Sequence, residues 1–312
     1  MSWSTTALPD QSDRTIVITG STAGIGYFAA EQLAAAGAHV VLASRSDTKL
    51  AIARDAIRTQ VPAAEVSLVR VDLGSFASVD RAADEIAALP RLDGVFLNGG
   101  SMILRRGDRT SDDLPMLLGT HVIGHVRLLS RILPSLRASA ERDGTVARVV
   151  HASTGFVRRM RSSVDDLRRV PLTGLGAYVT AKTATEVFAF ELDRRLRAAG
   201  APVASIVSHP GVGVDAKTPI RAGIHDATTP RLRNPYTPWA QGKDAAAWSA
   251  VRAMTDPRAV GGQSYGPANG VRGEPIVIAA NKHTAHPGDH TAARVWDQLE
   301  ALSGSAVTIA AA

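Results

Sequence analysis

The sequence contains no cysteine among its 312 residues. This absence excludes disulfide bonds, thiolate metal sites and a catalytic cysteine, and it is typical of proteins in a reducing cytoplasm, where we expect this chain. Long apolar runs are also lacking. The two longest stretches without Asp, Glu, Lys or Arg are residues 198–214 and 15–30, both interrupted by Gly and Ser. Both are shorter than the thickness of a bilayer requires, so we expect no membrane span.

Lysine and aromatic residues are scarce. Only five of the 35 basic residues are Lys, and Phe, Trp and Tyr together number 14. The formal net charge of +6 could suggest an acidic partner such as nucleic acid. The arginines are spread over the whole chain, however, and the aromatics are too scattered to form a platform for base stacking. We therefore expect no nucleic-acid partner, and the sequence indicates no metal site.

Over the first 210 residues, short apolar β-branched runs alternate with longer Ala-rich stretches. This alternation is typical of a parallel sheet covered by helices on both faces. The runs predict strands at 15–19, 39–43, 66–70, 94–97, 147–151 and 204–208, with 275–278 as a seventh candidate. Apolar residues at spacings of three and four predict helices near 24–36, 47–60, 76–89, 114–138 and 177–199. We therefore predict an α/β fold with a doubly wound, Rossmann-like parallel sheet in a single domain, 1–312.

Three segments depart from this alternation. Residues 1–13 have no basic cluster and no apolar run, which predicts an N-terminal extension rather than a signal or transit peptide. Residues 211–239 contain four prolines and no periodicity. Their place directly after the sixth strand predicts a loop that covers the substrate, with a mobile surface excursion as the alternative. We expect residues 303–312 to be frayed.

A glycine-rich turn directly follows the first predicted strand. It consists of Gly20, Ser21, Thr22, Ala23, Gly24, Ile25 and Gly26, and an Ala-rich helix follows it. Such a turn lets the backbone approach a diphosphate, while the helix N-terminus offers unpaired N–H groups and the positive end of its dipole. The position of the turn therefore predicts a dinucleotide-binding site.

The end of the second predicted strand predicts which dinucleotide binds. Sites that prefer NAD usually carry an acidic residue there, which holds the ribose 2′-hydroxyl. Here Ser44 is neutral, and the guanidinium of Arg45 can form charge-assisted hydrogen bonds with a 2′-phosphate. We therefore predict NADP(H) as the cofactor. The alternative is that Arg45 is only a solvated residue at a strand end.

Tyr178 and Lys182 are four residues apart in a predicted helix, which places both side chains on one helix face. A free tyrosine has a pKa of about 10, too high for proton transfer near neutrality. An ammonium at roughly 4 Å, with an effective dielectric of about 20, favours the phenolate by about 4 kcal/mol. We therefore predict that Lys182 lowers the pKa of Tyr178, and that Tyr178 donates a proton to a carbonyl oxygen.

The Gly-x-x-x-Gly-x-Gly turn together with Tyr-x-x-x-Lys resembles the short-chain dehydrogenase/reductase family. The resemblance implies further site residues at the ends of strands. Asp72, with Leu73, would lie at the adenine, and Lys182 would also hold the nicotinamide ribose. Asn98, Gly99 and Gly100 correspond to the family's Asn-Asn-Ala-Gly motif. Pro210, Gly211 and Val212 correspond to the turn that faces the nicotinamide carboxamide.

Two catalytic positions differ from the family pattern or are ambiguous. The resemblance implies a hydroxyl after the fifth strand that orients the reacting oxygen. Thr154 matches it by register, and the neighbouring Ser153 is the alternative. Where the family carries the Asn of its Asn-x-x-Gly motif, which supports a proton relay, this chain has His121. His121 either carries protons itself or is a buried structural residue.

Several further blocks are similar to bacterial members of the retinol-dehydrogenase-like branch. They are Thr110–Asp112, Gly124–His125, Asp165–Leu167, Phe190–Leu196, Tyr265–Pro267 and Trp296. The resemblance implies a small to medium apolar or aromatic substrate and, as a family expectation, a homodimer or homotetramer. The predicted activity is NADPH-dependent reduction of a ketone or aldehyde, with the reverse alcohol oxidation allowed. His121 and Asp215 leave open a regulatory or scaffold protein that binds NADP(H) without turnover. A weaker alternative is reduction of an activated C=C bond.

Overall fold

The computed structural model describes residues 3–101, 107–231 and 234–309. In this part of the chain, eight strands form one sheet in the order β3-β2-β1-β4-β5-β6-β7-β8. Seven strands run parallel, and β8 pairs antiparallel with β7 at the edge. The strands are β1 (Thr15–Thr19), β2 (His39–Ser44), β3 (Val66–Arg70), β4 (Gly94–Leu97), β5 (Ala147–Ala152), β6 (Val203–Ser208), β7 (Ser264–Pro267) and β8 (Pro275–Ile278).

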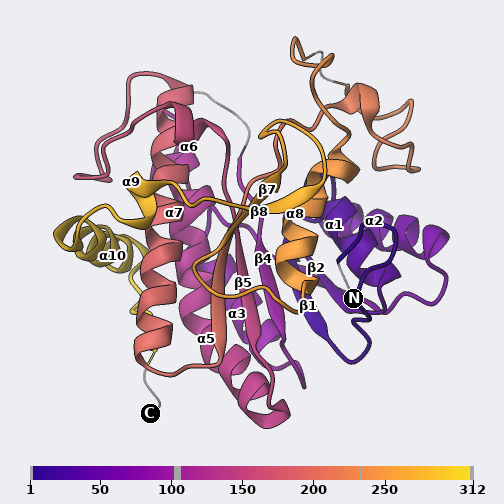
Figure 1. The fold of residues 1–312 in the computed structure, drawn as a ribbon, viewed down its shortest axis with the longest axis horizontal. Helices are drawn as coiled ribbons and strands as arrows, with labels where there is room; N and C mark the ends of the chain where they lie inside the picture. The colour runs from indigo at the N-terminus through magenta and orange to yellow at the C-terminus, as the bar shows by residue number, and fades with distance from the viewer. Residues whose placement is uncertain (1–2, 102–106, 232–233, 310–312) are drawn as a thin grey trace.

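Helices cover both faces of this sheet (Figure 1). They are α1 (Gly24–Ala35), α2 (Asp47–Gln60), α3 (Phe76–Ala87), α4 (Met116–Leu118), α5 (Gly124–Asp143), α6 (Phe156–Arg159), α7 (Gly174–Ala198), α8 (Lys243–Thr255), α9 (Lys282–Ala285) and α10 (Asp289–Ser303). A π-helical turn η1 (Gly119–Ile123) joins α4 to α5, and a short 3₁₀ helix η2 (Asp215–Lys217) follows β6. The doubly wound α/β fold predicted from the sequence is thus confirmed.

The central strands are buried on both faces because their side chains alternate between two cores. Val17 and Val41 point into a core built with α3, α5, α7 and α10. Ile18 and Leu42 point into a second core built with α1, α2 and α8. This two-sided burial explains why the strands are continuous apolar runs in the sequence.

The C-terminal third contains elements that we did not predict: β7, α8 and α10. Strand β7 has the sequence Ser-Tyr-Gly-Pro, which carries no β-branched residue. Helix α10 packs on α7, where the Trp296 ring stacks on Phe188 with centroids 5.1 Å apart. The guanidinium of Arg195 lies 4.0 Å from the centroid of the Trp296 ring. These contacts with distant segments hold α10 in place.

Both terminal segments pack on the domain where the structure describes them. Trp3 donates a hydrogen bond of 2.8 Å to the hydroxyl of Thr255 at the end of α8. In the tail that we expected to fray, Val307 is buried and the carbonyl of Ile309 accepts a hydrogen bond from Arg137. Residues 310–312 lie outside the described residues. Among the described helices, none is long and apolar enough to cross a bilayer.

Candidate active site

The glycine turn after β1 packs directly on the end of β4. A Cβ on Gly20 would lie 2.8 Å from the Cα of Gly99, and a Cβ on Gly26 would lie 2.4 Å from the carbonyl oxygen of Gly20. Gly20 also has φ of +68°, a conformation that L side chains rarely adopt. The turn therefore requires glycine at these positions, because any side chain would collide with backbone.

Thr19 and Asn98 join the carboxyl ends of β1 and β4. The hydroxyl of Thr19 accepts hydrogen bonds from the N–H groups of Asn98 and Gly99, at 3.0 and 2.9 Å. The Asn98 side-chain amide donates in return to the Thr19 carbonyl, at 3.1 Å. Asn98 thus fixes the ends of β1 and β4 against each other at the predicted dinucleotide site. This structural role does not require Asn98 to touch the ligand.

The start of α1 fits a diphosphate group. Its N-cap residue, Ala23, provides no side-chain cap, so the first N–H groups of the helix remain available to an anion. The hydroxyl of Ser21 is fully buried in the turn and has no hydrogen-bond partner among the described residues. A buried polar atom without a partner is costly, and a bound phosphate oxygen would satisfy it.

The end of the neighbouring strand β2 fits the ribose 2′-phosphate that distinguishes NADP(H) from NAD(H). The Ser44 hydroxyl lies 3.2 Å from that of Thr22, so β2 and the glycine turn are in contact. Arg45 is exposed and forms no ion pair with any residue that the structure describes. Its guanidinium is therefore available to a 2′-phosphate.

The remaining cofactor residues lie along the same edge of the sheet. The carboxylate of Asp72 accepts a hydrogen bond of 2.9 Å from the N–H of Gly74, and Leu73 packs against Gly99. Farther along, Gly211 has φ of +67° and lies against the backbone of residue 271. The N–H of Val212 donates to the carbonyl of Val271 at 2.9 Å, and the Pro210 carbonyl accepts from Gln241, also at 2.9 Å.

Tyr178 lies in the second turn of α7 and is half-buried. Burial raises the pKa of Tyr178 above its usual value of 10, and a hydrogen bond with the Thr154 hydroxyl offsets part of this rise. Ser153 instead donates to a carboxylate oxygen of Glu186. Of the two hydroxyls that the sequence left open, Thr154 therefore contacts Tyr178 and Ser153 does not.

Lys182, one helical turn after Tyr178, is buried and donates a hydrogen bond of 2.6 Å to the carbonyl of Ala152. Burial lowers the pKa of Lys182 to about 7, and the nearby Glu186 carboxylate offsets part of this shift. The lowered Tyr178 pKa that we expected is absent from the protein alone. Desolvation dominates at both residues, whereas our sequence argument counted only the attraction between them.

Glu186 is a buried carboxylate at this site that our sequence analysis missed. Besides Ser153, it accepts a hydrogen bond of 2.6 Å from the Thr284 hydroxyl on α9. Burial raises its pKa. Its spacing could have indicated it, because a residue four positions after Lys182 lies on the same helix face and therefore close to the Lys182 side chain.

His121 lies in the π-helical turn η1, and its ring centroid is 5.3 Å from that of Tyr178. Its Nε2 donates to the carbonyl of Ser101 at 2.9 Å, since a carbonyl can only accept. Burial and the charge of Lys182 hold the pKa of His121 well below its usual 6.5. Burial and the Lys182 charge thus disfavour the protonated imidazole, which favours a structural role for His121 over a proton relay.

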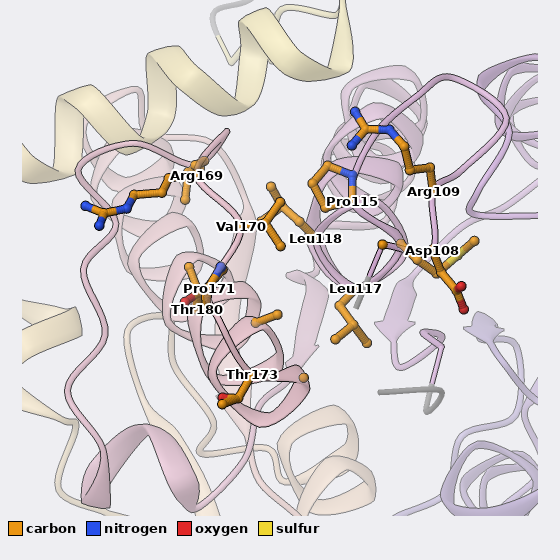
Figure 2. A pocket seen from close by; sticks show the side chains of 15 residues that line it. Asp108, Arg109, Pro115, Leu117, Leu118, Arg169, Val170, Pro171, Thr173 and Thr180 are labelled. Carbon is orange, nitrogen blue, oxygen red and sulfur yellow. The ribbon is translucent and has the colours of Figure 1, made fainter. Parts of the chain in front are cut away.

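A narrow apolar cavity opens beside α7 (Figure 2). Leu117, Leu118, Val170 and Pro171 line it, while the guanidinium of Arg169 points away from it. Its volume is about 50 Å³, smaller than the roughly 150 Å³ cavity that holds one benzene molecule. Tyr178 does not line it. This cavity is therefore too small to hold a whole substrate in this conformation.

Comparison with known proteins identifies the class to which this fold and site belong. A family model described as short chain dehydrogenase matches residues 14–225. The chain is 33% identical over 258 residues to a polyprenol dehydrogenase of Mus musculus, covering 81% of this chain and 75% of that protein. It is 36% identical over 203 residues to dehydrogenase/reductase SDR family member 13 of Bos taurus, covering 64% of this chain and 51% of that protein.

Solved structures share the fold. A crystal structure of an uncharacterized protein from Mycobacterium paratuberculosis matches 99% of this chain and all of that chain, with a TM-score of 0.76 and 27% identity. A short chain dehydrogenase from Shigella flexneri, solved with NADP, matches 83% of this chain and 99% of that chain, with a TM-score of 0.63 and 22% identity. This chain therefore belongs to the short chain dehydrogenase family, whose members are oxidoreductases that use nicotinamide cofactors.

Proposed function

We propose that this protein is an NADP(H)-dependent oxidoreductase that reduces the carbonyl group of an apolar or aromatic ketone or aldehyde. The reverse oxidation of an alcohol is allowed by the same groups. The observation that carries the proposal is that Tyr178 lies next to the Thr154 hydroxyl, with buried Lys182 one helical turn farther along α7, at the same sheet edge as the glycine turn. A carbonyl oxygen held between these two hydroxyls would meet a proton donor and an orienting group together.

The proposed roles follow from these contacts. Tyr178 stays protonated at neutral pH because its pKa is raised, so its hydroxyl can donate to the carbonyl oxygen. Lys182, with its pKa near 7, can hold a proton one helical turn from Tyr178 and replace the one that is lost. Bound NADPH supplies the hydride.

The relatives support an apolar substrate class. Polyprenol dehydrogenases of mouse and human are 33% and 28% identical to this chain over most of its length. Their name describes a long apolar alcohol, which agrees with the apolar character that the sequence blocks imply but is larger than the small to medium substrate that we expected. The test is NADPH oxidation with carbonyl compounds of graded size, from small aromatic aldehydes to isoprenoid aldehydes. Tight NADPH binding without turnover on any of them would favour a scaffold protein.

We predict that Arg45→Asp reverses the cofactor preference. The substitution replaces a guanidinium that can bind the 2′-phosphate with a carboxylate that repels it and binds the ribose 2′-hydroxyl. NADPH binding should weaken by about ten- to hundred-fold, the range for a hydrogen bond to a charged group, while NADH binding improves. Fluorescence titration of both nucleotides measures this. Arg58→Asp, at the far end of α2, is the control and should leave the preference unchanged, whereas tighter NADH binding by the natural protein would overturn the assignment.

We also propose that residues 211–239 cover the substrate. Their inner part is anchored, because Arg221 binds both carboxylate oxygens of Glu31 on α1, at 2.7 and 2.8 Å. Closure would therefore involve the outer part, where Tyr236 and Trp239 are exposed. Hydrogen exchange with NADPH and a substrate analogue should show new protection near Tyr236 and none near Arg221. Unchanged exchange throughout the segment would contradict a lid.

A further inference from the structure

A lysine outside the family motifs lies beside the glycine turn. Lys243 is the first residue of α8, and a Cβ on Gly24, the first residue of α1, would lie 3.7 Å from its Cδ. The N–H of Lys243 donates to the Thr218 hydroxyl at 2.9 Å, which fixes the base of the side chain. The side chain is 31% exposed, so its end can reach a ligand from solvent.

In the free protein, the ammonium of Lys243 forms an ion pair with Asp215, on the segment after β6. The Asp215 side chain is buried, and Nδ1 of His225 lies 3.8 Å from the same carboxylate oxygen. A buried carboxylate beside a diphosphate site would repel the ligand. The Lys243 ammonium offsets that charge and brings a cation to the opening of the turn.

We propose that Lys243 binds the cofactor diphosphate and that Asp215 is its counter-ion in the free protein. This inference rests on the proposed function. An ammonium has three donors, so Lys243 can turn toward phosphate oxygens while the fixed base of its side chain stays in place. The ligand then receives the cation from one side and the N–H groups of α1 from the other. Asp215 positions Lys243 and also competes with the ligand for it.

Calorimetric titration with three probes tests this proposal: NADP⁺, ADP-ribose and adenosine 2′-monophosphate. The first two contain the diphosphate and the third does not. Lys243→Met should weaken NADP⁺ and ADP-ribose binding by about ten- to hundred-fold and leave adenosine 2′-monophosphate within about threefold. Asp215→Asn should tighten the two diphosphate ligands. Lys282→Met removes an equal charge from the exposed start of α9 and should leave all three affinities unchanged.

The double variant Asp215→Asn/Lys243→Met separates binding from folding. It leaves no unpaired buried carboxylate, so any weakening relative to Asp215→Asn alone reflects the lost lysine. We expect that weakening to be at least about tenfold for ADP-ribose. Equal affinity of the double variant and Asp215→Asn would overturn the proposal. If the natural protein binds neither NADP⁺ nor NAD⁺, the proposed function itself fails instead.

Discussion

Replacing Tyr178 with Phe should lower the rate of carbonyl reduction by at least about a hundredfold, the lower limit for losing a general acid. The change removes one hydroxyl and little volume. The Thr154 hydroxyl would remain to orient the carbonyl, but the donor of the proton would be gone. Initial rates with saturating NADPH measure the loss.

Nucleotide binding is the control for this variant. NADPH affinity should stay within about threefold of the natural value, because the residues that fit the diphosphate and the 2′-phosphate lie on other elements. Lys182→Ala should both lower the rate of carbonyl reduction and weaken NADPH binding. If Tyr178→Phe kept more than about a tenth of the natural rate, another proton donor would have to be found.

Acid should destabilise this protein sharply. Burial lowers the pKa of His125 and His151 to about 3 and that of His209 to about 4. The unfolded chain binds protons at these residues near pH 6.5 while the folded chain does not, so stability falls as the pH drops below about 6.5. At pH 5 each histidine costs about 2 kcal/mol relative to neutrality, or about 6 kcal/mol for the three as an upper limit. That sum approaches the whole stability of many domains, which is about 5–15 kcal/mol.

Urea unfolding at pH 7.5 and pH 5 measures this effect. His151→Gln can keep a hydrogen bond to the Ser205 hydroxyl, which His151 now makes at 3.1 Å, and should flatten the pH dependence by close to one proton. His290→Gln is the matched control, because His290 is exposed. A stability that is constant from pH 7.5 to pH 5 would contradict neutral burial of these histidines.

The sheet and most helices could be predicted because local pattern determines them. Strands 15–19, 66–70, 94–97 and 275–278 have the predicted bounds, and each contains a β-branched or apolar run. Helix 114–138 was placed correctly but is three segments, since η1 interrupts it at His121. The π-helical turn has no signal in composition. Gly124, which directly follows the turn, packs closely on the chain after β3, because a Cβ there would lie 2.4 Å from the carbonyl oxygen of Leu73.

The site could be predicted in part. Glycine spacing and the four-residue step from Tyr178 to Lys182 are local, so the sequence indicated both features. Three contacts of the site join segments 24 to 33 residues apart in sequence, which local patterns do not report. They are the contact of Thr154 with Tyr178, the hydrogen bond of Ser153 to Glu186, and the ion pair of Asp215 with Lys243. Burial raises the pKa of Tyr178, whereas we expected it to be lowered. The spacing of residues in the sequence does not show how deeply a particular hydroxyl is buried.

The central claim is hydride transfer to a carbonyl carbon, and isotope transfer tests it most directly. NADPH carrying deuterium at the transferable C4 position is incubated with the protein and an α,β-unsaturated aldehyde of apolar character, and the product is analysed by mass spectrometry. We expect the allylic alcohol, one mass unit heavier, with deuterium on the former carbonyl carbon, formed at least about a hundredfold more slowly by Tyr178→Phe. Deuterium at the β-carbon of a saturated aldehyde, or bound NADPH with no labelled product from any substrate, would contradict the account.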